Sequence, residues 1–396
     1  MSAWLVKRSL VVTLSIGALA SAVALVACAS SDDESASDDD AGNNVVPVED
    51  AGEPDVAIDA DADADASSTC SPGGWCHTEL PADVTLTGVW GDGTGVVWAV
   101  SKQGQVLRWD GSAWKVHASG LGSLRAIWGS SPADLWLSSE AGLVHGTGAS
   151  SDSIVFTDVT APGDPSAVIT SIWGAGPDDV WAVGGTSGFA PYAGRVLHYG
   201  GAAAGWTVED VTTEPIAFTH VWGSAASGVW LGGHFFSDEE FYDEGVVLRR
   251  APSETAFTPV ALPISPTDAR DRLGRIGGVS VLNGGTMLVV GKTTYEITSS
   301  LHATSSDNGK TFAWSLRRER GQMYTMSGTF GSAANDAWMA GEYGRVWHWD
   351  GTEWTQSAVS ISKLPITRDF HAMWGQPSKE LWVVGDRLAV KRELSK

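Results

Sequence analysis

Short apolar runs recur along the chain from Leu86 onward, each followed by a turn and a second apolar run. In six copies two aromatic residues stand eight positions apart, at Trp90/Trp98, Trp128/Trp136, Trp173/Trp181, Trp222/Trp230, Phe330/Trp338 and Trp374/Trp382, and Gly follows the first of each pair. A seventh copy keeps apolar strands at 276–281 and 287–291 and lacks both tryptophans. A period of about 40–55 residues with four short strands per copy predicts an all-β, seven-bladed β-propeller.

The first copy outlines the expected blade. Its apolar runs predict strands at 86–90, 96–101, 105–109 and 113–118, with Asp110-Gly111 as a hairpin turn. The last copy ends after three strands, whereas Trp75 precedes the first copy as an outer strand would. We therefore predict that residues 75–80 pair with residues 388–394, complete the last blade and close the ring.

The first 27 residues have the pattern of an export signal, since Lys7 and Arg8 precede an uncharged apolar run. The sequence Leu25-Val26-Ala27-Cys28 resembles the lipobox of bacterial lipoproteins, in which a signal peptidase cuts before the cysteine, whose thiol and new amino group become acylated. The resemblance implies a lipid anchor on Cys28, and an uncleaved membrane-spanning anchor is the alternative. Ala29 is not the aspartate associated with inner-membrane retention, so we expect a cell-envelope location that favours the outer membrane.

The next segment, residues 28–69, predicts an acidic, disordered tether. Residues 29–69 contain 14 acidic residues and no Lys or Arg, so they cannot bury enough apolar surface to fold. This segment accounts for much of the net charge of −22, because residues 70–396 carry 33 acidic against 23 basic residues. No basic patch of the kind that binds nucleic acid is present. We expect residues 70–396 to form the propeller.

The three cysteines separate into two roles. If Cys28 is lipidated, Cys70 and Cys76 remain as a pair in an oxidising compartment. We predict a structural disulfide between them, at the junction of tether and propeller.

Residues 305–312 of the fifth copy read Ser-Ser-Asp-Asn-Gly-Lys-Thr-Phe. They resemble the Asp-box of sialidase-type (neuraminidase-repeat) propellers, a folding turn in which the carboxylate binds backbone N–H groups. The resemblance does not imply sialidase activity, because the arginine motif of those enzymes is missing. Residues 75–396 as a whole resemble the Trp-rich repeat propellers of exported bacterial lipoproteins.

A basic residue recurs on the third strand of six copies, with Glu296 expected at that position in the eroded copy. These residues are Arg108, His145, His198, Arg249, His348 and Lys391. An acid stands two residues before the second tryptophan in four copies, at Asp134, Asp179, Asp336 and Glu380. The pattern predicts cross-strand charge pairs that stiffen the blades, comparable to the His–Asp network of WD-repeat propellers. A regular repeat of this kind argues against a unique catalytic or metal site.

A unique site is expected where the repeat is broken. Two neighbouring connections between second and third strands are long, at 184–194 and 232–245, and arginines flank the eroded copy. The candidate ligand-binding residues are Phe189, Tyr192, His234, Phe235, Phe236, Phe241, Tyr242, Arg270, Arg272 and Arg275. Arg317, Arg318 and Arg320 stand on the link that leaves the eroded copy.

Several readings of this sector remain open. The aromatic side chains can stack on sugar rings or hold a protein partner. Asp238, Glu239, Asp243 and Glu244 can bind a structural Ca²⁺, or a pair of them can act as acid and base on a glycoside. The simplest reading is a loop that packs its aromatics on the neighbouring blade and leaves its acids in water.

No nucleophile elbow, phosphate-binding glycine loop or zinc-binding helix motif is present. The sequence therefore predicts a lipid-anchored, non-catalytic and monomeric binding platform for a polysaccharide or protein partner, with no cofactor apart from the calcium reading. The alternatives are a carbohydrate-active hydrolase or lyase of propeller fold and a scaffold subunit of an envelope assembly.

Overall fold

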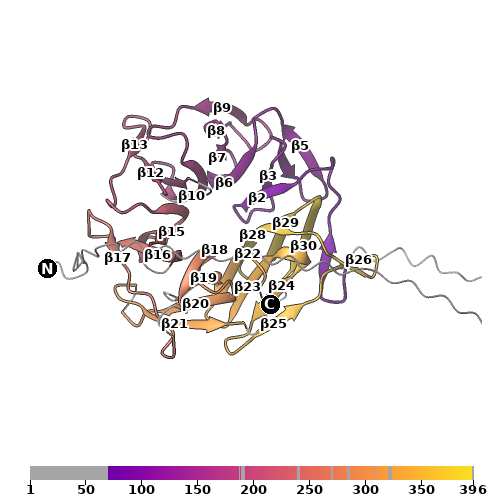
Figure 1. The fold of residues 1–396 in the computed structure, drawn as a ribbon. Helices are drawn as coiled ribbons and strands as arrows, with labels where there is room; N and C mark the ends of the chain where they lie inside the picture. The colour runs from indigo at the N-terminus through magenta and orange to yellow at the C-terminus, as the bar shows by residue number, and fades with distance from the viewer. Residues whose placement is uncertain are drawn as a thin grey trace, which may run out of the picture. The chain divides into compact units, whose positions relative to one another are not determined.

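The computed structural model describes residues 70–186, 188, 192–238, 241–268, 271–282, 286–307, 309–319 and 323–394. They form one compact unit of seven four-stranded antiparallel sheets arranged in a ring (Figure 1). The predicted seven-bladed β-propeller is confirmed. The predicted signal, Cys28 and the tether lie outside the described residues. Within the described part of the chain, no helix has the length and hydropathy needed to cross a membrane.

The first four blades follow the repeat in order. Blade one contains β2 (Leu86–Gly91), β3 (Val97–Ser101), β4 (Val106–Trp109) and β5 (Trp114–Ala118). Blade two contains β6 (Leu124–Ser131), β7 (Asp134–Ser139), β8 (Gly142–Thr147) and β9 (Val155–Val159). Blade three contains β10 (Val168–Gly176), β11 (Asp179–Gly185), β12 (Gly194–Tyr199) and β13 (Trp206–Val208). Blade four contains β14 (Ala217–Ser224), β15 (Gly228–Ser237), β16 (Tyr242–Arg250) and β17 (Thr258–Pro259).

The remaining blades include the eroded copy and the closing one. Blade five, the eroded copy, contains β18 (Leu273–Leu282), β19 (Thr286–Thr293), β20 (Thr298–Thr304) and β21 (Ala313–Arg318). Blade six contains β22 (Met326–Ala333), β23 (Asp336–Gly341), the short 3₁₀ helix η2 (Glu342–Gly344), β24 (Val346–Trp349) and β25 (Trp354–Ser357). Blade seven contains β28 (Phe370–Gln376), β29 (Glu380–Gly385), β30 (Leu388–Glu393) and β1 (Trp75–His77). A small hairpin, β26 (Ser360–Ile361) and β27 (Leu364–Pro365), lies between blades six and seven in sequence.

The N-terminal strand closes the ring as predicted. β1 pairs antiparallel with β30 and places Trp75 opposite Arg392, so the first described strand completes the last blade. The Trp75 indole is fully buried, and its Nε1–H donates a 2.9 Å hydrogen bond to Ser357 Oγ of blade six. The predicted disulfide between Cys70 and Cys76 is also confirmed, directly beside this strand.

The Trp-Gly dipeptide has a packing role between blades. The first aromatic residue of a blade lies against the glycine of the following blade, so that a Cβ on Gly129 would come within 2.8 Å of the Trp90 ring. The same approach repeats for Trp128/Gly174, Trp173/Gly223, Phe330/Gly375 and Trp374/Gly91. A side chain at these glycines would force the two sheets apart, because protein interiors are already close-packed.

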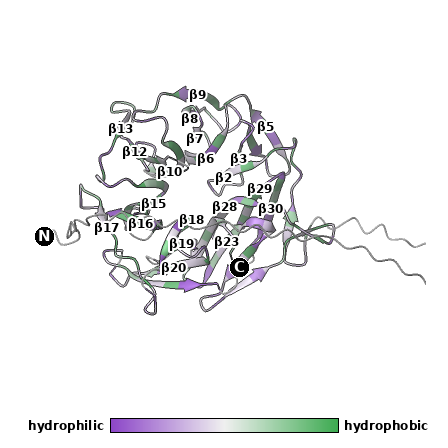
Figure 2. Cartoon of the chain, viewed as in Figure 1, coloured by the Kyte–Doolittle hydropathy of each residue, from purple (hydrophilic) through white to green (hydrophobic). Residues whose placement is uncertain are grey.

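The second tryptophan of six repeats contributes to the core. Trp98, Trp136, Trp181, Trp230, Trp338 and Trp382 are all buried. Each apolar cluster joins neighbouring blades, as where Trp98 of blade one packs with Leu135 and Leu137 of blade two. Figure 2 shows hydrophobic residues on strands within the blades and hydrophilic residues on outer strands such as β5. Burial of large aromatic side chains between sheets is the main favourable contribution to this fold.

Acidic turns connect third and outer strands. The Asp110 carboxylate accepts hydrogen bonds from the backbone N–H groups of Ser112 and Ala113, as expected for a hairpin turn. In blade five the Asp307 carboxylate accepts hydrogen bonds from the N–H groups of Lys310 and Thr311. These contacts order the turns and identify them as structural elements.

Candidate functional site

The repeated histidines belong to the scaffold, as the sequence pattern predicts. His145, His198 and His348 donate from Nε2 to Asp134, Asp179 and Asp336 over 2.7, 2.9 and 2.8 Å. Each imidazole also stacks on the second tryptophan of its blade, with ring centroids 3.9 to 4.2 Å apart. In blade seven Lys391 pairs with Glu380 at 3.3 Å. Because each donor is held between a carboxylate and an indole, these groups stiffen the blades.

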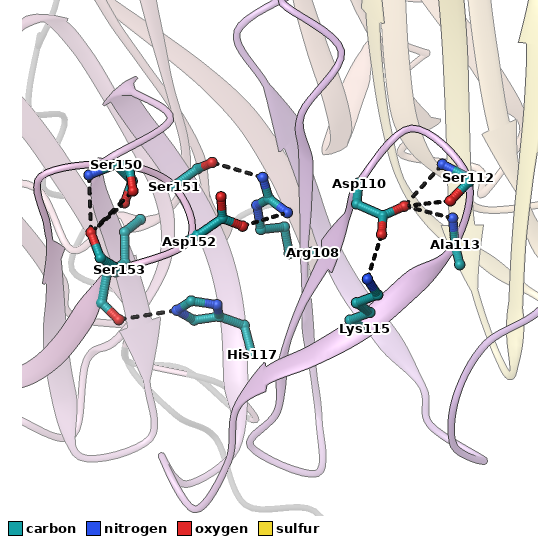
Figure 3. A network of polar contacts seen from close by, with 11 residues as sticks. Arg108, Asp110, Ser112, Ala113, Lys115, His117, Ser150, Ser151, Asp152 and Ser153 are labelled. Carbon is teal, nitrogen blue, oxygen red and sulfur yellow. Dashed lines mark hydrogen bonds and ion pairs between the residues drawn. The ribbon is translucent and has the colours of Figure 1, made fainter.

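Blades one and four have no acid two residues before the second tryptophan. Their arginines contact the following blade instead. Arg108 donates to Ser151 Oγ over 2.8 Å and pairs with Asp152 at 3.1 Å, on the turn of blade two (Figure 3). Arg249 donates to the carbonyl oxygens of Gly309 and Lys310 on the corresponding turn of blade five. In these two blades the basic residue therefore connects neighbouring blades instead of pairing with an acid of its own blade.

Blade five corrects the expected register. Glu296 does not stand at the basic position, because β20 begins at Thr298 and its His302 lies opposite Leu288, where other blades have the second tryptophan. The position is thus basic in all seven blades. Glu296 lies in the turn between β19 and β20, and this places it beside the candidate site.

The long connection expected at 232–245 is mostly strand. β15 and β16 extend the hairpin so that Ser237 pairs with Tyr242 and Phe236 pairs with Asp243. Phe235 and Phe236 therefore point to opposite faces. Phe235 packs on the apolar cluster of blades three and four, whereas Phe236 lines a pocket. Arg275 likewise lies on the inner strand β18 and not in a link, and Arg317 and Arg318 end the outer strand β21.

The pocket lies where blades three, four and five meet on the face that carries the connections between second and third strands. Its volume of about 510 Å³ falls within the range of small-molecule sites. It is lined by Gly188, Tyr192, Phe236, Phe241, Tyr242, Asp243, Gly274, Arg275, Thr293, Thr294 and Glu296. The structure thus brings together five of the predicted ligand-binding residues, namely Tyr192, Phe236, Phe241, Tyr242 and Arg275. Phe189, Arg270, Glu239 and Arg320 lie outside the described residues.

Asp243 is the polar centre of the pocket. Its carboxylate accepts a 2.9 Å hydrogen bond from the Tyr192 hydroxyl and hydrogen bonds from the Arg275 guanidinium, with 2.6 Å from Nε. Burial and the hydrogen bond to Asp243 raise the pKa of Tyr192. The His234 ring lies edge-on to Tyr192 with centroids 4.9 Å apart, and burial lowers the pKa of this histidine. His234 supports the pocket wall without lining it.

The other acids of the hairpin are arranged differently. Glu244 pairs with Arg272 at 3.1 Å, and Arg272 also donates to the Tyr242 hydroxyl over 3.2 Å. Asp243 and Glu244 are successive strand residues and point to opposite faces, so they do not converge on one ion. Asp238 is exposed at the hairpin turn. Among the described residues no group of three or more His, Cys, Asp or Glu side chains is placed to share a metal.

Two pocket residues adopt a left-handed backbone conformation that favours glycine. Phe241 has φ of 59° and is 79% exposed, and Glu296 has φ of 61°. Gly104 and Gly344 occupy the position of Glu296 in blades one and six, since an equivalent backbone hydrogen bond encloses each turn, as from Thr293 N–H to the Ile297 carbonyl oxygen in blade five. Such conformations cost about 1–2 kcal/mol for residues other than glycine. The pocket therefore holds an exposed phenylalanine and a glutamate at backbone positions where glycine would avoid this cost.

Sequence reasoning included Arg275 of blade five but missed the β19–β20 turn of that blade. Thr293, Thr294 and Glu296 line the pocket from the β19–β20 turn. The sequence signal for this turn was Glu296, an acid at the turn position where blade one has Gly104. Because this copy lacks both tryptophans, its sequence could not be aligned with the other repeats, and the turn position of Glu296 was not recognised.

These features define a Trp-rich seven-bladed propeller with one irregular sector. No protein-family model matches the chain, and a sequence search of curated proteins found no match. Among solved structures the fold is similar to YCF48 from Cyanidioschyzon merolae, at 14% identity over 81% of this chain and 99% of that one, with a TM-score of 0.57.

It is also similar to virginiamycin B lyase from Staphylococcus aureus, at 11% identity over 80% of this chain and 98% of that one, with a TM-score of 0.58. The extracellular domain of BT4673 from B. thetaiotaomicron matches at 11% identity over 81% of this chain and 39% of that one, also with a TM-score of 0.58. The fold is therefore shared with binding proteins and with a lyase, and identities this low establish the fold alone.

Proposed function

We propose that this chain is an exported, lipid-anchored and non-catalytic binding platform whose ligand occupies the pocket of blades three to five. The lipobox-like sequence ending at Cys28 supports the anchor in the cell envelope, with the outer membrane favoured. A tether of about 40 residues would let the propeller reach roughly 35 Å from the lipid, and further if its charges repel. A Cys28→Ser variant should lack the acyl chains that the native chain carries, which intact-mass spectrometry measures.

The observation that carries the proposal is the exposed Phe241 in the pocket. Nothing in the packing of the propeller needs a phenylalanine that is 79% exposed at a backbone position suited to glycine. Retained backbone strain of this kind gathers at ligand sites. The other residues that line the pocket come from the two long connections and the eroded copy, the segments that depart from the repeat.

The ligand classes are a polysaccharide and a protein partner. Exposed aromatic side chains beside paired polar groups suit either ligand. A structure of YCF48 bound to D1 peptide has the same fold as this chain, at 15% identity over 82% of this chain and 97% of that one, with a TM-score of 0.57. That likeness is one of fold and keeps a protein partner among the candidates, whereas the pocket chemistry favours the saccharide.

A carbohydrate-active hydrolase or lyase is the alternative. Among the described residues its acid–base pair would have to be Asp243 and Glu296, the two carboxylates that line the pocket. Asp243 is already held by Tyr192 and Arg275, which favours a positioning role over proton transfer. Product release from the same polysaccharides, measured beside binding, decides between a platform and an enzyme.

The proposal is tested with two matched variants of the full chain in mild detergent. Phe241→Gly removes the pocket aromatic and relieves its backbone strain, so we expect the melting temperature to change little. Tyr343→Gly is the control, because Tyr343 also has a positive φ of 57° and is 60% exposed, yet lies outside the pocket. Both variants are compared with the native chain against a panel of neutral and acidic polysaccharides and a peptide library.

Binding that is lost in Phe241→Gly and retained in Tyr343→Gly, without breakdown of the ligand, supports the platform. Breakdown of a polysaccharide replaces the platform by the enzyme. If binding survives in Phe241→Gly, the ligand is held elsewhere and the proposed site is wrong. A scaffold that uses blade edges would give this last result.

A further inference from the structure

We infer that the ligand of this pocket is an uncharged saccharide chain, an inference that rests on the proposed binding function. The first ground is the shape of the aromatic wall. Phe236, Phe241 and Tyr242 line one pocket, and the Phe241 residue is largely exposed to solvent. The C–H face of a sugar ring is apolar and slightly positive, so it packs on the electron-rich face of an aromatic ring.

The second ground is the charge balance of the pocket. Asp243 is paired with Arg275, and Glu296 is paired with Lys292 at 3.2 Å. Behind the wall, Glu244 is paired with Arg272. Every described acid that lines the pocket therefore has a basic partner, so the described lining is close to neutral. An anionic ligand would meet arginines that already hold carboxylates, and it would approach Asp243 and Glu296 at a Coulombic cost.

The third ground is the hydrogen-bonding character of these pairs. The side chains of Arg275 and Glu296 are 56% and 57% exposed, so both can still reach a ligand. A guanidinium presents only donors and a carboxylate presents only acceptors. Sugar hydroxyl groups donate and accept at once, so neighbouring hydroxyls can bind both kinds of group without adding charge.

Together these properties describe a surface that stacks on a ring and hydrogen-bonds its edge. The pocket volume of about 510 Å³ suits a short stretch of a polysaccharide chain rather than a folded protein surface. A peptide remains the competing ligand, and the experiment separates the two.

The experiment titrates the full chain with neutral glucans, mannans and galactans, with uronic-acid and sulfated polysaccharides, and with the peptide library. Each titration is repeated at about 50 mM and about 500 mM NaCl, because salt screens charged contacts and leaves stacking unaffected. We expect a neutral polysaccharide to bind with an affinity that changes by less than about twofold between the two salt concentrations. Phe241→Gly should weaken that binding by about tenfold or more, and Phe241→Tyr should retain it.

The charge pair provides a second readout. Arg275→Gln leaves Asp243 without its cation, so we expect weaker binding of the neutral chain and still weaker binding of acidic chains. A ligand recognised through charge would differ in the native chain, where it would bind with steep salt dependence and acidic chains would be preferred to neutral ones.

Each result has a defined meaning. Preferential binding of an acidic polysaccharide, or of a peptide, at the Phe241-dependent site overturns the neutral-saccharide inference and leaves the proposed platform intact. Failure of every neutral polysaccharide to bind also overturns the inference. If Phe241→Gly leaves the binding affinity unchanged, the proposed site itself is wrong.

Discussion

At the scale of single residues, this fold depends on glycines that allow two sheets to approach. Gly129 lacks the Cβ that would lie 2.6 Å from Leu135 and 2.8 Å from the Trp90 ring. A Gly129→Ala variant should therefore lose about 1–3 kcal/mol of unfolding free energy through overpacking. Urea denaturation measures this loss. Gly176→Ala is the control, because its Cβ would meet nothing within 4 Å, and an equal loss in both variants would contradict the packing argument.

The Trp–His–Asp units make the stability of the fold depend on pH. The hydrogen bond from His348 and those from Ser332 and Trp338 hold the pKa of Asp336 below its usual value of 3.8. A depressed carboxyl pKa adds stability that is present above the unfolded pKa and lost as the pH falls through the folded pKa. Because a third of the Asp336 side chain is exposed, we expect Asp336→Asn to cost only about 1 kcal/mol at pH 7.

The cost of Asp336→Asn should shrink as the pH falls from about 4, near the unfolded carboxyl pKa, through the lower folded pKa, below which the native carboxyl has also lost its charge. Thermal unfolding at a series of pH values measures the difference between the two proteins. Asp158→Asn, on the exposed outer strand β9, should match the native chain throughout. A pH-independent cost of Asp336→Asn would show that the loss is steric and not electrostatic.

At the scale of elements, the β15–β16 hairpin separates packing from recognition. Phe235 faces the apolar cluster and Phe236 faces the pocket, although they are neighbours in sequence. Phe235→Ala should cost about 2 kcal/mol of stability, because the side chain is half-buried, and should spare ligand affinity once the protein is folded. Phe236→Ala should lower affinity with a smaller effect on stability. Unfolding and binding curves of both variants test this, and equal profiles would contradict the assignment of faces.

The same elements explain how far sequence reasoning reaches. Periodicity predicted the blades because each repeat carries its own markers, the two aromatic residues and the Asp-Gly turn. It failed at blade five, where both tryptophans are lost and nothing in the sequence marks the register of His302. It also treated residues 234–237 as loop, because an extension of a hairpin depends on pairing across the strands rather than on local composition. Glu296 joins the pocket only through the approach of blades four and five.

At the scale of the whole molecule, stability depends on closing the ring through blade seven. Trp75 on β1 is fully buried, lies 5.7 Å from Trp338 of blade six in an edge-on arrangement, and bonds to Ser357. We expect Trp75→Ala to cost about 3–5 kcal/mol, because it removes a core aromatic and loosens the strand that joins the ends of the propeller. The Cys70–Cys76 disulfide limits the freedom of that segment, so its removal should cost a further amount of roughly 2 kcal/mol.

Ring closure predicts more than a loss of stability. Trp354 is the equivalent control, because it is buried on the outer strand of blade six and takes no part in joining the ends. Trp354→Ala should lower the unfolding free energy by a comparable amount and leave β1 protected from amide hydrogen exchange. Trp75→Ala should speed exchange in β1 and its partner β30 before the remaining blades open, since locally weakened strands exchange through local unfolding. If both variants leave exchange in β30 unchanged, the N-terminal strand is not what holds the ring shut.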